Sequence, residues 1–176
     1  MLPPKKSFLY RLGKHPWFIP YHRLFILIVL INAGIMIKAF TTWNWFSLEN
    51  IQLNKIAELI LYNFTLAILI RQQYIINILF KIATNVPKNW PLIIRRVCAK
   101  VYHFGGLHSS SATMGTVWYI VFVICLYYNY IYKLHNISAA IILVTTLILS
   151  LLIGIIITAL PKMRAKYHNQ FEIAHR

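Results

Sequence analysis

The residues best suited to chemistry in this chain are two pairs of histidines in its second half. His103 and His108 precede one apolar segment, and His168 and His175 follow the next one. Imidazole nitrogen binds haem iron, zinc, copper and non-haem iron, so residue type alone leaves the metal open. If the two apolar segments are antiparallel membrane helices, both pairs return to the same membrane face. The sequence therefore predicts a histidine-bound haem or metal on that face.

Spacing within the second pair supports this prediction. Residues seven apart on an α-helix are separated by two turns with a drift of only about 20°, so His168 and His175 would share one face. Glu172 falls between them on the same stripe, and the Glu-x-x-His spacing also occurs in helical carboxylate-bridged metal sites. Iron and zinc are the non-haem candidates. The expected metal ligands are His103, His108, His168, His175 and Glu172.

Three arginines and one further histidine are suited to an anionic cofactor. In a continuous second span, Arg71 would lie about 14 Å deep, where a charge costs roughly 2.5–3.5 kcal/mol. It would then hold a haem propionate, a phosphate or a carboxylate; alternatively, the span ends near Ile70 and the next residues lie along the interface. Arg95 and Arg96 contact lipid headgroups or an anionic cofactor. His22 is expected on the same membrane face.

Composition places these residues in a membrane protein. Of 176 residues, 59% are hydrophobic and only three are acidic, and the mean hydropathy is +0.62. A soluble globular domain of ordinary composition does not fit these values. The net charge of +15 falls mostly between apolar segments, as membrane topology requires, and not on a separate soluble domain. Membrane lipids are therefore expected partners, and nucleic acid is not.

Four apolar segments are each near the roughly 20 residues that a membrane-crossing helix needs. The predicted spans cover residues 24–40, 56–80, 113–132 and 138–160. Lysine and arginine concentrate before the first span, between the second and third, and after the fourth, which places both termini and the central loop in the cytoplasm. In that loop, Pro91 begins an expected amphipathic interfacial helix, which Gly105-Gly106 would end.

These elements define the predicted fold class, an all-α integral membrane protein with four transmembrane helices. Residues 1–176 would form a single membrane domain, either complete or the N-terminal part of a longer membrane region. Other catalytic machinery is not evident, because the chain has no Asp, no Gly-rich phosphate loop and no Ser/His/Asp set. A composition rich in Ile, Asn and Lys suggests an AT-rich bacterial genome, and with it the bacterial inner membrane.

Three segments resemble a known family. The stretches LYNFTLAILIRQQYIINILF, PLIIRRVCAKVYHFGGLHSSSA and LPKMRAKYHNQFEIAHR look like the membrane region of fungal and bacterial ferric-reductase-like proteins, over roughly residues 56–176. In the fungal members this region is joined to an N-terminal adenylate-forming domain and a C-terminal FAD/NAD(P)H-binding module. The resemblance points to the two histidine pairs and Arg71. Ferric reductases proper place paired haem histidines within spans, whereas no histidine here lies inside a predicted span.

The resemblance implies an oxidoreductase or a subunit of one. Electrons would pass from a nicotinamide through a flavin toward the membrane, and a cytoplasmic flavoprotein partner would supply the FAD and NAD(P)H. Two alternatives stay open on the residues alone. One is a histidine-rich membrane metalloenzyme acting on a lipid-like substrate. The other is a non-catalytic membrane anchor or assembly module.

Overall fold

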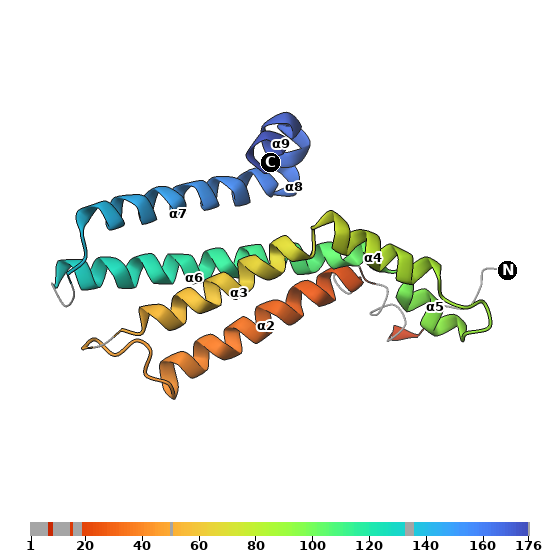
Figure 1. Cartoon of the computed structure of the whole chain (residues 1–176), viewed down its shortest axis with the longest axis horizontal. Helices are drawn as coiled ribbons and strands as arrows, with labels where there is room; N and C mark the ends of the chain where they lie inside the picture. The colour runs from red at the N-terminus through yellow and green to blue at the C-terminus, as the bar shows by residue number, and fades with distance from the viewer. Residues whose placement is uncertain (1–6, 9–14, 16–18, 50, 133–135, 176) are drawn as a thin grey trace. The chain divides into compact units, whose positions relative to one another are not determined.

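The computed structural model describes residues 7–8, 15, 19–49, 51–132 and 136–175. These residues form helices joined by turns, with no strand among them (Figure 1). Their bounds are α2 (Pro20–Thr41), α3 (Leu53–Leu69), α4 (Gln73–Thr84), α5 (Leu92–Cys98), the 3-10 helix η2 (Val101–Phe104), α6 (Gly105–Ile131), α7 (Ala139–Ala159), α8 (Pro161–Lys166) and α9 (His168–His175). The all-helical class predicted from the sequence is therefore confirmed for the described part of the chain.

The chain divides into two compact units. Unit 1 comprises residues 1–36 and 63–112, and unit 2 comprises residues 37–62 and 113–176. The boundaries fall inside three helices, α2, α3 and α6. Each unit thus contains one end of each of these helices, and the candidate residues are distributed between the two.

Among the described helices, α2, α6 and α7 are long and apolar enough to cross a membrane. If α3 and α4 are counted as one broken span, the number of candidate spans rises from three to four. α2 and α7 match the first and fourth predicted spans closely. α7 begins after Ser138, whose Oγ accepts the backbone N–H of Ile141, and it ends before Pro161, the first residue of α8.

The prediction of one continuous helix over residues 56–80 is wrong. α3 ends at Leu69, α4 begins at Gln73, and the two are bent by 59° (Figure 1). At the break, the N–H groups of Arg71 and Gln72 bond to carbonyls three residues earlier, which tightens the last turn and ends the helix. The structure agrees instead with the alternative in which the span ends just before Arg71.

The segment after the break is amphipathic. α4 has no buried residue, and its polar side chains recur every three or four positions, at Gln73, Asn77, Lys81 and Thr84. α5 contacts α4 and is exposed except for Cys98, which is half-buried. It is shorter than the interfacial helix predicted from Pro91 onward. A polar stripe on an otherwise apolar helix is the pattern of helices that lie along a membrane surface.

The Gly105-Gly106 pair begins a helix and does not end one, contrary to the prediction. α6 starts at Gly105, well before the predicted start of the third span at Thr113. The reason is tertiary: a Cβ on Gly106 would overlap the carbonyl oxygen of Tyr21 in α2 and would lie 3.1 Å from its carbonyl carbon. Helices approach this closely only where one of them lacks a side chain. As a consequence, His108 lies inside α6, although no histidine was expected within a span.

Hydrogen bonds join α6 to α7 in unit 2. The hydroxyl of Tyr119 donates to the carbonyl of Thr145 at 3.2 Å, and Tyr127 Oη lies 3.0 Å from Thr146 Oγ1. Trp118 is completely buried in the same part of α6. α8 and α9 pack against each other and against α7. This packing holds the C-terminal histidine segment at the end of α7.

Candidate functional site

Unit 1 brings together the start of α2, the end of α3 and the start of α6. The hydroxyl of Tyr21 donates to Ser109 Oγ at 2.8 Å, and Ser109 Oγ donates to the carbonyl of Gly105 at 3.1 Å. His22 and His108 are the sequence neighbours of this bonded pair. The tight contact of Gly106 with Tyr21 and the Tyr21–Ser109 bond therefore fix the part of α6 that carries His108.

His108 is oriented by the break between α3 and α4. Its Nδ1 lies 2.8 Å from the carbonyl oxygen of Ala67, in the last turn of α3. In a continuous helix the N–H of Arg71 would occupy that carbonyl, but it bonds to Ile68 instead. A carbonyl oxygen only accepts, so His108 Nδ1 must carry the hydrogen. In the neutral imidazole, Nε2 then keeps its lone pair for a ligand or a proton.

The other predicted residues of unit 1 are less constrained. His22 is half-buried, and its ring meets that of Tyr21 edge-on, with centroids 5.4 Å apart. His103 lies in η2, with Nδ1 3.3 Å from the carbonyl of Lys100. On α5, Arg95 donates to the carbonyl of Lys88 at 3.3 Å. Arg96 is also exposed, as expected of a residue that contacts headgroups or an anion.

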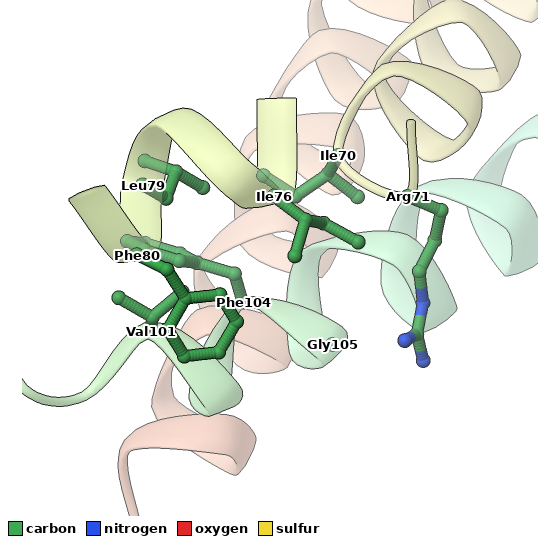
Figure 2. Close-up of a pocket in the computed structure, with 8 residues that line it drawn as sticks. All are labelled: Ile70, Arg71, Ile76, Leu79, Phe80, Val101, Phe104 and Gly105. Atoms are coloured by element: carbon green, nitrogen blue, oxygen red, sulfur yellow. The ribbon is translucent and has the colours of Figure 1, made fainter. Parts of the chain in front are cut away.

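Arg71 borders a small cavity in unit 1. The cavity has a volume of about 180 Å³. Six apolar side chains line it, from Ile70, Ile76, Leu79, Phe80, Val101 and Phe104. Figure 2 shows the side chain of Arg71 beside this group, with its guanidinium extended away from Ile70 and Ile76. The predicted anion-binding residue therefore stands next to an apolar recess.

The C-terminal histidines lie in unit 2. His168 and His175 are the first and last residues of α9, so the helix assumed by the spacing argument is confirmed. Glu172 and both histidines are exposed. The ring of His175 packs on the ring of Phe171, with centroids 4.2 Å apart. The guanidinium of Arg164 lies over the same phenylalanine ring, 5.8 Å from its centroid.

The predicted metal ligands thus fall into two groups. His103 and His108 belong to unit 1, whereas His168, Glu172 and His175 belong to unit 2. Across the described ranges, no three His, Cys, Asp or Glu side chains gather as a potential metal-binding group. Binding of a metal by all five residues stays a prediction.

Several polar residues in the site region were not anticipated from the sequence. Tyr21 and Ser109 position α6, and nothing in their local sequence marks them. Asn32 and Asn63 pair between α2 and α3; a lone amide in an apolar segment is a signal that could have found them. Ser111 is fully buried, and its Oγ has no hydrogen-bond partner within the described residues.

Comparison with known proteins places most of the chain against part of much longer fungal proteins. It is 36% identical over 163 residues to adenylate-forming reductase 06235 of Coprinopsis cinerea. It is also 34% identical over 164 residues to adenylate-forming reductase 03009 of the same fungus. Each match covers 93% of this chain and 15% of the relative. This chain is similar to one portion of fungal adenylate-forming reductases.

The remaining comparisons identify no family and no related fold for the chain. No protein-family model and no solved structure matches the chain. Both relatives are fungal, so they give no support to the expected bacterial inner membrane. The apolar helices support a membrane protein, and the names of the relatives support a link to redox proteins.

Proposed function

We propose that the chain is a membrane domain of a reductase-type redox protein and that its histidines hold haem near the cytoplasmic face. The orientation of His108 carries the proposal. Its Nδ1–H is bound to the carbonyl of Ala67, which is the arrangement that orients a histidine whose other nitrogen ligates a metal. Similarity to proteins named reductases over 93% of the chain supports the redox part.

The residues of unit 1 suit haem better than a non-haem metal site. A non-haem site needs three or four protein ligands, and no such group occurs among the described residues, whereas haem needs one or two. His108 would hold the haem iron, and His22, Arg95 and Arg96 would contact anionic groups of the cofactor. Bound haem would supply one-electron transfer. A cytoplasmic flavoprotein with FAD and NAD(P)H is the proposed electron donor.

A visible absorption spectrum of the purified full chain, expressed with haem supplied, tests the proposal. We expect a Soret band with stoichiometric haem, and His108→Ala should lower haem content by at least roughly tenfold. His135→Ala is the control and should leave haem content unchanged, since His135 falls between the third and fourth predicted spans, on the membrane face opposite the proposed site.

Three results would contradict this proposal. Equal haem content in His108→Ala and the parent chain would reject His108 as ligand. Stoichiometric iron or zinc without a Soret band would favour the metalloenzyme acting on a lipid-like substrate. If the purified protein contained neither haem nor metal, the remaining interpretation would be a non-catalytic membrane anchor or assembly module.

We also propose the four-span topology with both termini and the central loop in the cytoplasm. Its test uses Cys98, which is half-buried on α5, whereas Cys125 is buried in α6. A membrane-impermeant maleimide should label Cys98 in inverted vesicles and not in intact cells. Ser47→Cys in a chain that also carries Cys98→Ser, with the new cysteine at an exposed position between α2 and α3, should show the reverse pattern. Labelling of Cys98 in intact cells would overturn this topology.

A further inference from the structure

Arg71 belongs to a unit without any acidic residue. The three carboxylates of the chain, Glu49, Glu58 and Glu172, all lie in unit 2, where Glu58 already pairs with Lys55 at 3.2 Å. Unit 1 carries eleven basic residues, namely Lys5, Lys6, Arg11, Lys14, Arg23, Arg71, Lys81, Lys88, Arg95, Arg96 and Lys100. Arg71 is exposed, and unit 1 itself offers it no carboxylate side chain as a partner.

The cavity beside Arg71 indicates what kind of apolar group an anion bound there would have. Six of its eight lining residues have apolar side chains, and the other two are Gly105 and Arg71, so most of its side chains favour contact with hydrocarbon. At about 180 Å³ it is smaller than the roughly 300–1,000 Å³ of pockets that enclose drug-sized ligands. It therefore suits a stretch of a single chain and not a macrocycle such as haem.

Gly105 leaves space next to the guanidinium. A Cβ at this position would lie 3.6 Å from Arg71 Nη2 and 3.5 Å from the ring of Tyr21. Glycine at this position therefore leaves about the volume of one methyl group open beside the guanidinium. In Figure 2 the Arg71 side chain is drawn next to Ile70 and Ile76, and Leu79, Phe80 and Val101 lie on the opposite side of the group.

We propose that this recess binds an anionic amphiphile, with its acyl chain in the cavity and its carboxylate or phosphate paired with Arg71. The planar guanidinium fork matches both head groups in a bidentate arrangement. Burial of the chain against Ile76, Leu79 and Phe104 supplies the apolar part of the affinity. The site is separate from the haem proposal and does not depend on it.

Binding to the purified full chain in a neutral detergent tests this site. The probes are radiolabelled myristate, lysophosphatidic acid with the same acyl chain, and myristyl alcohol, which has the chain without the charge. We expect both anions to bind at least roughly tenfold more tightly than the alcohol. Tighter binding of myristate would assign the ligand to free fatty acids, and tighter binding of lysophosphatidic acid would assign it to phospholipids. Equal binding of the alcohol and both anions would overturn the proposal.

Variants distinguish specific binding at Arg71 and the recess from non-specific electrostatic binding to a basic surface. Arg71→Gln should remove the preference for anions, and Arg23→Gln, at another exposed arginine of unit 1, should keep it. Ile76→Trp should fill the recess and weaken all three probes by roughly tenfold, whereas Ile93→Trp, at a residue 75% exposed on α5, should not.

The proposal fails if Arg23→Gln weakens binding as much as Arg71→Gln, or if Ile76→Trp binds normally. Circular dichroism confirms that each variant is folded. Should Arg71→Gln not fold, Arg71→Lys and Ile76→Trp decide the question. Arg71→Lys keeps the charge and should retain the preference for anions with weaker binding, because the bidentate fork is lost. Loss of that preference in a folded Arg71→Lys variant would also contradict the proposal, as would unchanged affinity in Ile76→Trp.

Discussion

Substitution of Gly106 by Ala is expected to destabilise the protein by about 1–3 kcal/mol, the range for overpacked interiors. The added Cβ would overlap the backbone carbonyl of Tyr21 and would lie 3.3 Å from its Cα. Backbone atoms cannot rotate away as a flexible side chain can, so α2 and α6 would have to separate. We expect a Tm several degrees lower in detergent, measured by circular dichroism at the helical signal.

Two other glycines of unit 1 provide matched controls. Gly105 is the neighbouring residue, but its added Cβ would make only ordinary contacts at 3.5 Å or more, so Gly105→Ala should be tolerated. Gly34 in α2 has nothing within 4 Å of the added atom. Gly34→Ala should therefore be neutral or stabilising by up to about 1 kcal/mol, because Ala is the better helix former. Equal stability of Gly106→Ala and Gly34→Ala would show that α2 and α6 do not approach each other closely at Gly106.

The long apolar helices could be predicted because hydropathy and length are local properties. α2 and α7 have no interruption, and their ends carry ordinary signals such as Ser138 and Pro161. The break before α4 was harder to predict, since apolar residues continue on both sides of the short polar run at Arg71 and hydropathy stays high across it. The carbonyl of Ala67 left at the break is satisfied by His108, forty-one residues away in the sequence. No local pattern contains that partner.

The role of the Gly105-Gly106 pair likewise could not be predicted from the local sequence. Glycine is equally typical of a helix end and of close helix packing, and the local sequence does not choose between them. The choice depends on Tyr21 of α2, which is distant in sequence and unremarkable in composition. The prediction therefore started the third long helix too late and left His108 outside it.

The candidate site could be predicted in part. The shared helix of His168 and His175 follows from their spacing, and Arg71 was marked by its charge within an apolar segment. The hydrogen bond that fixes His108, and the recess beside Arg71, arise only when α3, α4 and α6 pack together. Sequence thus identified residue types suited to chemistry, whereas tertiary contacts determine which atoms are available.

The pairing of Asn32 with Asn63 provides the second large expected effect. Each side-chain amide donates to the other, at 3.2 Å and 2.9 Å, and both residues are buried, with 5% and 7% exposed. Asn63→Leu would remove one partner and leave the amide of Asn32 without this pairing in an apolar environment. We expect a loss of about 1–3 kcal/mol, because Asn32 Nδ2 keeps its bond to the carbonyl of Ile28 but Asn32 Oδ1 loses the buried donor Asn63 Nδ2. Thermal unfolding in detergent would measure it.

The double variant distinguishes a paired contact from two independent losses. Asn32→Leu together with Asn63→Leu replaces both amides by apolar groups, so no polar group is left unpaired by the change. We expect it to be more stable than the sum of the two single effects predicts, with a coupling of about 0.6–1.7 kcal/mol, the range for hydrogen bonds between membrane helices. Additive losses would mean that the two amides do not stabilise α2 against α3 through each other. Coupling in this range would assign Asn32 and Asn63 the role of fixing the register of α2 and α3, the helices that carry Tyr21 and Ala67.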